Sequence, residues 1–421
     1  MQKNLKDSGV DWIGEIPSEW NVVRAKTIFT NHKTIAGNKS SEYERLALTL
    51  KGVIKRSKDD STGLQPEAFD GYQVLNPGEL VFKLIDLENL QTSRVGLSPY
   101  CGIVSPAYII LTPDMDKVVP EFAEMYFLSM WQRAIFNHMG DDGVRSSLSS
   151  KDLLNVPIVL PSKETQIKIS SFLKKRQFSI DRIISEMTQS INDYKKLKQS
   201  IIIEATTKGI RKNREMKDSN IEWIGDIPAD WKVERHKNVM HKSKDICNYY
   251  DGEDIISLTM NGVVIRDLDA GGKMPTSFDG YQYVQPGDLL LCLFDVDVTP
   301  RCVGLVKNHG ITSPAYSRFI IHNGYLNRYY DYLLRGIDDN KSFLHLAKNL
   351  RSSFTEEDFG AIHTVVPPFA EQLEIANYLD DKLSKIDSLI AKKENVISEL
   401  ENYKKSIIYE YITGKKEVPE L

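Results

Sequence analysis

The longest helical signal in this sequence is SKETQIKISSFLKKRQFSIDRIISEMTQSINDYKKLKQSIIIEATTK, residues 162–208. Apolar residues recur in it at alternating steps of three and four, the seam spacing of a coiled coil. The predicted seam residues are Leu173, Arg176, Ile180, Ile183, Met187, Ser190, Tyr194, Leu197 and Ile201. Adding 206 to each number gives a second seam of the same spacing, made of Leu379, Lys382, Ile386, Leu389, Lys393, Val396, Leu400, Tyr403 and Ile407. The sequence therefore predicts two long helices of one design.

The remainder of the chain is also present in two copies. Residues 7–24 (DSGVDWIGEIPSEWNVVR) match residues 218–235 (DSNIEWIGDIPADWKVER) at ten of eighteen positions, far more than composition alone would give. Further matches follow in the same order: LTLKGVIKR (48–56) with LTMNGVVIR (258–266), FDGYQVLNPGELVF (69–82) with FDGYQYVQPGDLLL (278–291), GIVSPAY (102–108) with GITSPAY (310–316), and RSSLSSKD (145–152) with RSSFTEED (351–358). The duplicated unit is a globular part followed by a long helix.

Each copy combines short strands with helices. Apolar runs alternate with Gly, Pro and Asn turn signals over residues 43–113, residues 120–139 and 325–335 have helical patterns, and Ser149 and Thr355 begin capping boxes. The predicted fold class is α+β, with two duplicated mixed α/β domains separated by two long helices that form an antiparallel, pseudo-two-fold coiled coil. The predicted boundaries are 1–160 for the first domain, 161–210 for the first helix, 211–366 for a basic linker and the second domain, and 367–421 for the second helix.

Charge favours pairing of the two helices with each other. Residues 163–217 carry fourteen Lys or Arg against six Asp or Glu, whereas residues 371–421 carry eight against eleven. Opposite charges favour the mixed pair over two like helices, and a connection through a whole domain favours an antiparallel pair. The alternative is that each helix folds back on its own domain.

Composition and motifs indicate a binding protein rather than an enzyme. The 421 residues include neither an N-terminal apolar segment nor an uninterrupted apolar run of membrane-spanning length, so we expect a cytoplasmic chain with no membrane contact. The four cysteines lack zinc-site spacing. We find neither a P-loop nor a dinucleotide fingerprint nor an H-E-x-x-H motif. The sequence therefore predicts no catalytic residue, no metal and no cofactor in this chain.

The repeated segments resemble the specificity subunit of a type I restriction-modification enzyme. The resemblance rests on the W-I-G-[ED]-I-P-x-x-W opening, the G-[DE]-L turn, the R-S-S-x-[ST] segment, and the helix entries PSKETQIKISSFL (161–173) and PPFAEQLEIANYL (367–379). It covers essentially the full chain, although Thr165 replaces in the first copy the glutamate that is Glu371 in the second.

The resemblance implies a division of labour. Two target-recognition domains would each read one part of a split double-stranded DNA target. The paired helices would act as a spacer and dock two methyltransferase subunits, which would bind S-adenosylmethionine, and motor-nuclease subunits would join for restriction. This chain itself would be a non-catalytic subunit.

Candidate DNA-binding residues occupy related positions in the two copies. Arg56 and Arg266 follow Gly-containing strands, and arginine suits bidentate contact with guanine or phosphate. Arg145 and Arg351 precede the capped helices, where binding loop carbonyls explains them equally well. Two matched pairs differ, Lys51 from Asn261 and Lys83 from Cys292, as two readers of different half-sites would. The full candidate set is Lys51, Arg56, Lys83, Arg145, Ser146, Ser147, Asn261, Arg266, Arg351, Ser352 and Ser353.

Net charge sets a condition on this interpretation. DNA readers are usually basic because phosphate neutralisation supplies much of their affinity. This chain has a net charge of −4 and a pI near 6.1. It fits a reader that binds DNA within a complex whose other subunits supply positive surface. The alternative function is a duplicated protein-binding scaffold with a coiled-coil spacer, and a third, a nuclease or methyltransferase, has no motif to support it.

Overall fold

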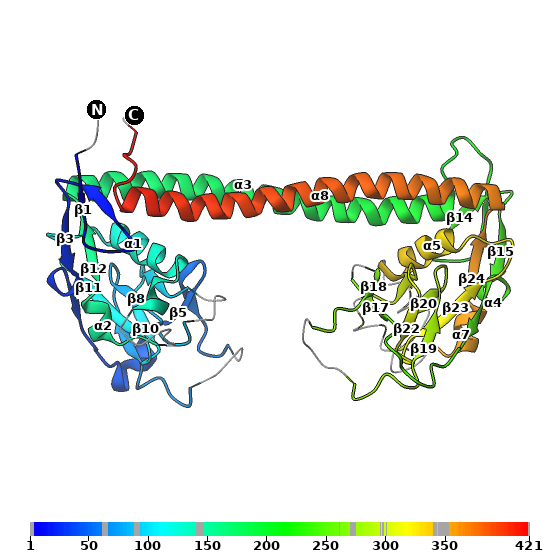
Figure 1. Ribbon diagram of the computed structural model, residues 1–421, viewed down its shortest axis with the longest axis horizontal. Coiled ribbons are helices and arrows are strands. Elements are labelled where there is room, and N and C mark those ends of the chain that lie inside the picture. Colours follow the sequence, from blue (N-terminus) through cyan, green and yellow to red (C-terminus); the bar gives the residue numbers. More distant parts are fainter. Residues whose placement is uncertain are drawn as a thin grey trace. The chain divides into compact units, whose positions relative to one another are not determined.

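The computed structural model describes residues 4–60, 66–87, 93–139, 147–260, 262–269, 275–294, 296, 299, 301–339, 343 and 353–419. The chain divides into two compact units: unit 1 is Met1–Met187 with Asn395–Leu421, and unit 2 is Thr188–Glu394. Each unit holds one globular part and segments of both long helices (Figure 1). The predicted fold class, α+β with a duplicated sheet-rich domain, is confirmed.

Unit 1 contains four small sheets, in the orders β1-β2, β6-β5-β10-β7, β4-β11-β8-β9 and β12-β3. Its pairs are antiparallel apart from β5 with β10. The elements are β1 (Leu5–Asp7), β2 (Glu15–Pro17), β3 (Asn21–Arg24), β4 (Phe29–Asn31), β5 (Arg45–Thr49), β6 (Gly52–Arg56), β7 (Gln73–Leu75), β8 (Leu80–Phe82), β9 (Val95–Leu97), β10 (Gly102–Val104), β11 (Ile109–Pro113), α1 (Pro120–Gln132), α2 (Ser150–Leu154) and β12 (Pro157–Leu160), with 3-10 turns at Ala25–Thr27, Gly37–Glu42 and Ile135–His138.

Unit 2 repeats this topology strand for strand. Its sheets are β13-β14, β18-β17-β22-β19, β16-β23-β20-β21 and β15-β24. The elements are β13 (Met216–Asp218), β14 (Asp226–Pro228), β15 (Lys232–Arg235), α4 (His236–Val239), β16 (Met240–Ser243), β17 (Ile255–Thr259), β18 (Gly262–Ile265), β19 (Gln282–Val284), β20 (Leu289–Leu291), β21 (Val303–Leu305), β22 (Gly310–Thr312), β23 (Ser317–Ile321), α5 (Asn327–Asp339), α7 (Glu356–Ala361) and β24 (His363–Val366).

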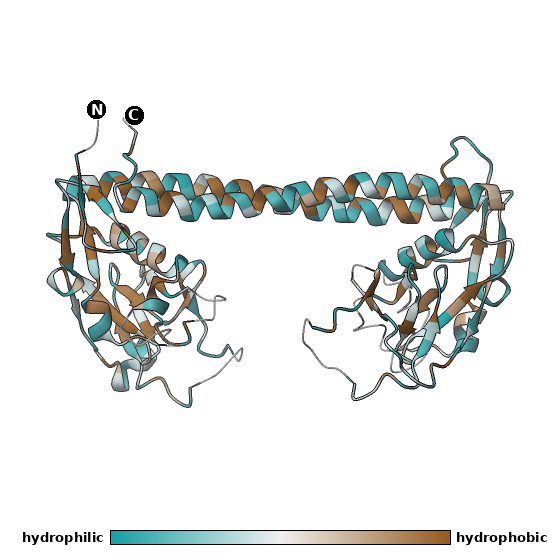
Figure 2. Cartoon of the chain, in the orientation of Figure 1, coloured by the Kyte–Doolittle hydropathy of each residue, from teal (hydrophilic) through white to brown (hydrophobic). Residues whose placement is uncertain are grey.

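Each core lies between a sheet and the helix after it. In unit 1, α1 buries Tyr126 and Phe127, and the Phe127 ring meets Phe82 of β8 edge-on at 4.9 Å. In unit 2, α5 buries Tyr329 and Tyr330 in the same way. The central strands are correspondingly apolar (Figure 2). In both units, aromatic side chains of this helix therefore hold it against the sheet.

A glycine in β9 and another in β21 let the two four-stranded sheets of each unit approach closely. A Cβ added at Gly96 would lie 2.7 Å from Leu48 Cδ1, and one at Gly304 would lie 2.7 Å from Val263 Cγ2. Real Cβ atoms do not approach that closely, so a side chain there would push the β5–β6 or β17–β18 hairpin away. The repeated V-G-L sequence thus fixes where each hairpin sits.

The helix starts expected from the capping boxes are confirmed. Ser149 Oγ accepts from Asp152 N at 3.2 Å while Asp152 Oδ2 accepts from Ser149 N at 2.9 Å. Thr355 and Asp358 repeat the pattern in unit 2. The helix expected over 120–139 ends at Gln132, because Ala134 adopts a left-handed φ of 55°. The helix expected over 325–335 is α5.

The two long helices are α3 (Lys163–Lys208) and α8 (Phe369–Ile412). Each is followed by a glycine with φ of 74°, Gly209 or Gly414, which is the usual helix stop. The second helix is therefore shorter than its expected range, 367–421. No helix among the described residues is long and apolar enough to cross a membrane.

Within each unit, segments of α3 and α8 pack in opposite directions. In unit 1, Phe172 meets Tyr411 with ring centroids 4.8 Å apart, and Lys404 pairs with Asp181 at 2.5 Å. In unit 2, Lys393 lies over Tyr194 at 5.9 Å, and Lys198 pairs with Asp387. Higher residue numbers on one helix thus meet lower numbers on the other. Both helices contribute to both cores, unlike the alternative in which each packs on its own domain.

The predicted seam is right at alternate positions and shifted by one residue at the others. Leu173, Ile180, Leu379, Ile386 and Ile407 are buried, and Met187, Tyr194, Ile201, Val396 and Leu400 are partly buried. Six predicted seam residues are exposed instead: Arg176, Ile183, Leu197, Lys382, Leu389 and Tyr403. Burial moves to the following residue, as at Ile191, Leu383 and Ile390. Steps of three and four both stay near one helix face, so apolar neighbours such as Ile183-Ile184 and Leu389-Ile390 satisfy either register.

A buried histidine distinguishes the second unit. His236 is fully buried against Phe359, with ring centroids 4.7 Å apart, where the first copy has Ala25 after the matching Arg24. Burial is the main cause that lowers the pKa of His236 to about 4, with a smaller contribution from His363. The imidazole is therefore neutral in the folded unit at pH 7. In the unfolded chain it takes up a proton at a higher pH than in the folded unit.

The corrected seam predicts opposite outcomes for two neighbouring substitutions. Ile390→Asp places a charge in a buried position that is 8% exposed, so the free energy of unfolding of unit 2 should fall by about 3 kcal/mol or more. Leu389→Asp, at a position 42% exposed, should change it by less than about 1 kcal/mol. Urea unfolding followed by tryptophan fluorescence measures both. Equal effects of the two changes would contradict this register.

The neutral histidine predicts acid sensitivity. With a pKa of about 4 in the folded state and about 6.5 when unfolded, His236 contributes stability above pH 6.5 that is lost as the pH falls toward 4. Between pH 7 and pH 5 the loss should be about 2 kcal/mol. His236→Ala, which copies Ala25, should remove this part of the pH dependence, whereas His241→Ala at an exposed position should leave it. Unfolding titrations at several pH values measure this. If the idea is wrong, the free energy of unfolding of His236→Ala will fall with decreasing pH as steeply as that of the unsubstituted chain.

Candidate nucleic-acid interface

The candidate interface in each unit is a β-hairpin on a four-stranded sheet. Thr49 Oγ1 donates to Gly52 O at 3.0 Å and accepts from Lys51 N at 3.1 Å, which holds the turn between β5 and β6. In unit 2, Thr259 Oγ1 donates to Gly262 O at 2.9 Å. The glycines have φ of 91° and 95°, in the region that favours residues without a Cβ. The repeated T-x-x-G sequence therefore builds one turn twice.

Two of the predicted residues of unit 1 share this hairpin. Lys51 is exposed beside its apex, and Arg56 closes β6, where its Nε lies 2.8 Å from Asp60 Oδ2. In unit 2, Arg266 follows β18 directly and is half-buried, and its backbone N donates to Ile255 O at 2.7 Å. The sheet thus presents an arginine at the same place in both units.

Lys83 and Ser147 belong to a second location in unit 1, beyond the end of β8. Lys83 is half-buried there and its backbone N donates to Arg94 O at 3.0 Å. Ser147 is exposed and bridges to Ile85, two residues further on. In unit 2, Ser353 precedes Phe354, whose N donates to Leu293 O at 2.7 Å, so it occupies the matching place. The remaining predicted residues, Arg145, Ser146, Asn261, Arg351 and Ser352, lie outside the described residues.

The repeated S-P-A-Y segments form turns that a buried glutamine holds against each sheet. Gln73 Nε2 donates to Ser105 O at 3.0 Å and to Tyr108 O at 2.5 Å. Gln282 Nε2 donates to Ser313 O at 3.2 Å and to Tyr316 O at 2.6 Å. Sequence reasoning missed these glutamines, although their repetition in FDGYQ was a signal for them.

The tyrosines of these turns lie within electrostatic range of the arginines of the hairpin. Burial raises the pKa of Tyr108, Tyr72 adds to that, and Arg45, Arg94 and Arg56 oppose it. Burial likewise raises the pKa of Tyr316, next to Cys292, Arg266 and Tyr281. Both phenols are neutral at pH 7 and can donate or accept a hydrogen bond. Arg45 was missed because the second copy has Ile255 in its place.

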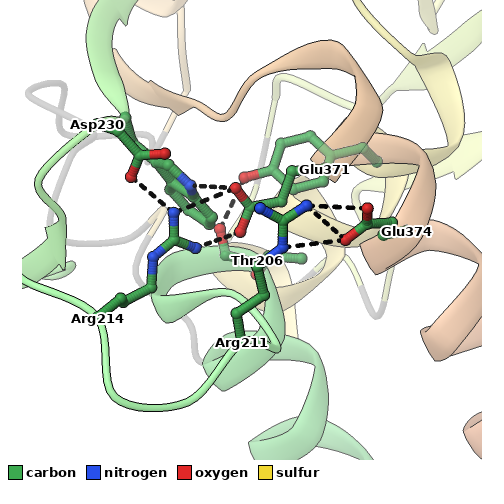
Figure 3. A network of polar contacts seen from close by, with 8 residues as sticks. Thr206, Arg211, Arg214, Asp230, Glu371 and Glu374 are labelled. Atoms are coloured by element: carbon green, nitrogen blue, oxygen red, sulfur yellow. Dashed lines mark hydrogen bonds and ion pairs between the residues drawn. The ribbon is translucent and has the colours of Figure 1, made fainter.

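The basic linker predicted after the first helix is held by acids of α8 in unit 2 (Figure 3). Glu371, 1% exposed, accepts from Arg214 and from Trp231 Nε1, the latter at 3.1 Å. Arg214 also meets Asp230 at 2.6 Å. One turn further along the helix, Glu374 accepts from both Nε and Nη2 of Arg211. The linker arginines thus serve the fold rather than a ligand.

Unit 1 lacks these acids. Thr165 replaces Glu371 and Lys168 replaces Glu374, and a surface groove of about 820 Å³ lies there beside Trp20 and Lys416. The glutamine after each position keeps its role: Gln166 Oε1 accepts from Val119 N, and Gln372 Oε1 accepts from Leu326 N, both at 2.8 Å. The helix entry is therefore common to both units, whereas the acidic clamp is specific to unit 2.

The chemistry available at the interface is hydrogen bonding and charge. Among the described residues, no group of three or more His, Cys, Asp or Glu side chains could hold a metal ion. The hairpins, their arginines and the tyrosine turns offer donors and aromatic faces, which are the groups that bind nucleic acid.

Comparison with known proteins points to one family. No family model matches the chain. The putative type I restriction enzyme MjaX specificity subunit of Methanocaldococcus jannaschii is 24% identical over 427 residues, covering 96% of this chain and 95% of that protein. The type I restriction enzyme MjaVIII specificity subunit of the same organism is 24% identical over 347 residues, covering 76% of each.

The fold agrees with the sequence comparison. A solved structure from work on complex assembly and conformational transition of the type I R-M system matches with a TM-score of 0.70 at 14% identity, covering 95% of this chain and 99% of that one. At that identity the match concerns the fold alone. Sequence similarity along nearly the whole length confirms the resemblance: this chain is similar to type I restriction enzyme specificity subunits.

Proposed function

We propose that this chain is the non-catalytic specificity subunit of a type I restriction-modification complex, and that it directs the complex to a bipartite DNA target. The observation that carries the proposal is the duplication of one sheet-and-hairpin site, with Arg56 and Arg266 at equivalent places. A duplicated protein-binding scaffold is not favoured, because the relatives that match the whole chain are specificity subunits.

Each unit reads one half of the target. Arginine forks suit guanine and phosphate, and the tyrosine turns beside them add neutral donors. Lys51, Lys83, Ser147 and Ser353 provide further polar contacts around the same sheets, and Arg145, Ser146, Asn261, Arg351 and Ser352 are proposed with them from the sequence. The two units differ at several matched positions, so they select different half-sites.

The long helices set the spacer between the half-sites and dock two methyltransferase subunits. Outside the faces that pack together, the helices expose large apolar side chains, among them Phe178 at 72% and Leu197 at 45%. Such residues on an otherwise charged helix suit a partner surface. The partners bind S-adenosylmethionine, supply the positive surface that a chain of net charge −4 needs on DNA, and work with motor-nuclease subunits in the cytoplasm.

A domain exchange tests the assignment of half-sites. Replacing residues 25–150 by the corresponding domain of another specificity subunit should change one half of the methylated motif and leave the other. The matched exchange of residues 236–356 should change the opposite half. Methylome mapping of cells that express each chimera with the methyltransferase measures both. A continuous motif, or a change in both halves from one exchange, would overturn the proposal.

A helix insertion tests the spacer. One heptad inserted after Ser190 and another after Val396 lengthen α3 and α8 by ~10 Å each, equivalent to about three base pairs. The half-site sequences should stay the same while the unread spacer grows by about that number. A single insertion, which unbalances the antiparallel pair, serves as the control and should abolish assembly. An unchanged spacer in the double variant would show that the helices do not set it.

A further inference from the structure

Both hairpins present a large apolar side chain at the apex. Leu50 of unit 1 is 62% exposed, and Met260, the matched residue of unit 2, is 60% exposed. Turn positions are dominated by Gly, Pro, Asn, Asp and Ser, so the backbone of this turn does not require an apolar residue. A single exposed Leu or Met is common on protein surfaces. Recurrence at one matched turn position in both copies indicates instead that the two side chains share a use.

The hairpins hold these side chains on a rigid support. In both units the strands stay paired up to the threonine and the glycine of the T-x-x-G turn, so only two residues lie beyond the last pair. The first of the two is the exposed apolar residue. Leu48 lies close to Gly96 of β9, and Val263 lies close to Gly304 of β21, which packs each hairpin against its neighbouring strand. A short loop on a packed ribbon keeps its shape when it is pressed against a ligand.

The exposed apolar surface continues from each apex onto the second strand of the hairpin. Ile54 of β6 is 39% exposed and Val264 of β18 is 36% exposed, again at matched positions. Each lies opposite a small residue, Ala47 or Ser257, on the same face of the hairpin. The apex and this part of the strand therefore offer apolar contact in both units.

Positive charge lies beside the apolar apex. Lys51 follows Leu50 directly and is exposed, and Lys55, which pairs with Glu44 at 3.3 Å, is exposed as well. In unit 2 the cation of the hairpin is Arg266. An apolar tip beside cations matches a duplex, in which stacked bases lie between two rows of phosphates. The major groove of B-DNA is also wide enough to admit a two-stranded β-ribbon.

We propose that Leu50 and Met260 are apolar wedges, each of which inserts between neighbouring bases of its half-site and unstacks them. This rests on the proposed function, because it assumes that each unit reads DNA. Residues that read different half-sites should differ between the units, as Lys51 and Asn261 do. Leu and Met are instead alike in length and apolar character, which suits a task common to both half-sites. Both are among the side chains that proteins insert between base steps.

Unstacking would serve the partner subunits. An enzyme that modifies a base must extrude it from the duplex, and the energy of unstacking is part of the cost of that step. A wedge that has already opened the stack lowers this cost for a neighbouring base. The two apex residues would thus act on the DNA and not on its sequence.

The test uses the full chain assembled with its methyltransferase subunits, on duplexes that carry its methylated motif. 2-Aminopurine, whose fluorescence rises when it is unstacked, replaces the base at each position in turn. Leu50→Ala should abolish the fluorescence gain at one step of the unit 1 half-site and weaken binding by about 10-fold, with the methylated motif unchanged. Met260→Ala should do the same in the unit 2 half-site only.

Two further variants serve as controls. Leu50→Met, which copies Met260, should keep the fluorescence gain. Met115→Ala removes an apolar side chain of unit 1 that is 55% exposed outside the hairpin, so it should change neither fluorescence nor binding. Loss of the signal in Met115→Ala would show that the effect does not belong to the apex.

The other outcomes each overturn the inference. A changed base preference in Leu50→Ala with an unchanged fluorescence gain would mean that the apex reads a base. Loss of the methyltransferase from the complex would mean that the apex contacts a protein. Unchanged fluorescence, affinity and motif would make Leu50 an ordinary surface residue, and the absence of any gain in the unsubstituted complex would also contradict the wedge. Failure of the proposed function would look different, because the unsubstituted complex would then yield no split motif at all.

Discussion

The seam between α3 and α8 is the constraint on which the two units depend. Each helix is long and charged on most of its surface, so neither could bury its apolar stripe without the other. Ile407, Ile408 and Ile412 of α8 belong to the core of unit 1, whereas Ile202 and Ala205 of α3 belong to the core of unit 2. A unit is therefore completed by a helix that begins in the other one.

How far the sequence predicts this seam depends on local ambiguity. The period of seven located Ile180 and Ile386, because a single apolar residue stands at each of these steps. It misplaced the alternate steps at Ile183 and Leu389, because each is followed by an isoleucine of equal hydrophobicity. Only packing against the partner helix chooses between such neighbours, and a one-dimensional pattern holds no information about that partner.

Repetition revealed the shared parts of the interface and concealed the parts that differ. Arg56 and Arg266, the capping boxes and the turn glycines recur in both copies and could be predicted from the alignment of the chain with itself. Gln73 and Gln282 also recur but resembled ordinary strand residues, since only the fold brings them under the S-P-A-Y turns. Arg45 is matched by Ile255 in the second copy, so a search for residues shared by the two copies does not find it.

Differences between the copies separate the needs of the fold from those of binding. In unit 2 the acids Glu371 and Glu374 balance Arg214 and Arg211, so each charge has a structural partner. In unit 1 the chain keeps the helix entry through Gln166 without those acids, which shows that the entry does not need them. The hairpins of the two units allow the same kind of comparison. Arg45 of unit 1 is buried and its Cζ lies 5.4 Å from the Phe69 ring centroid, whereas unit 2 has Ile255 at the matched place, so the sheet forms with either residue there.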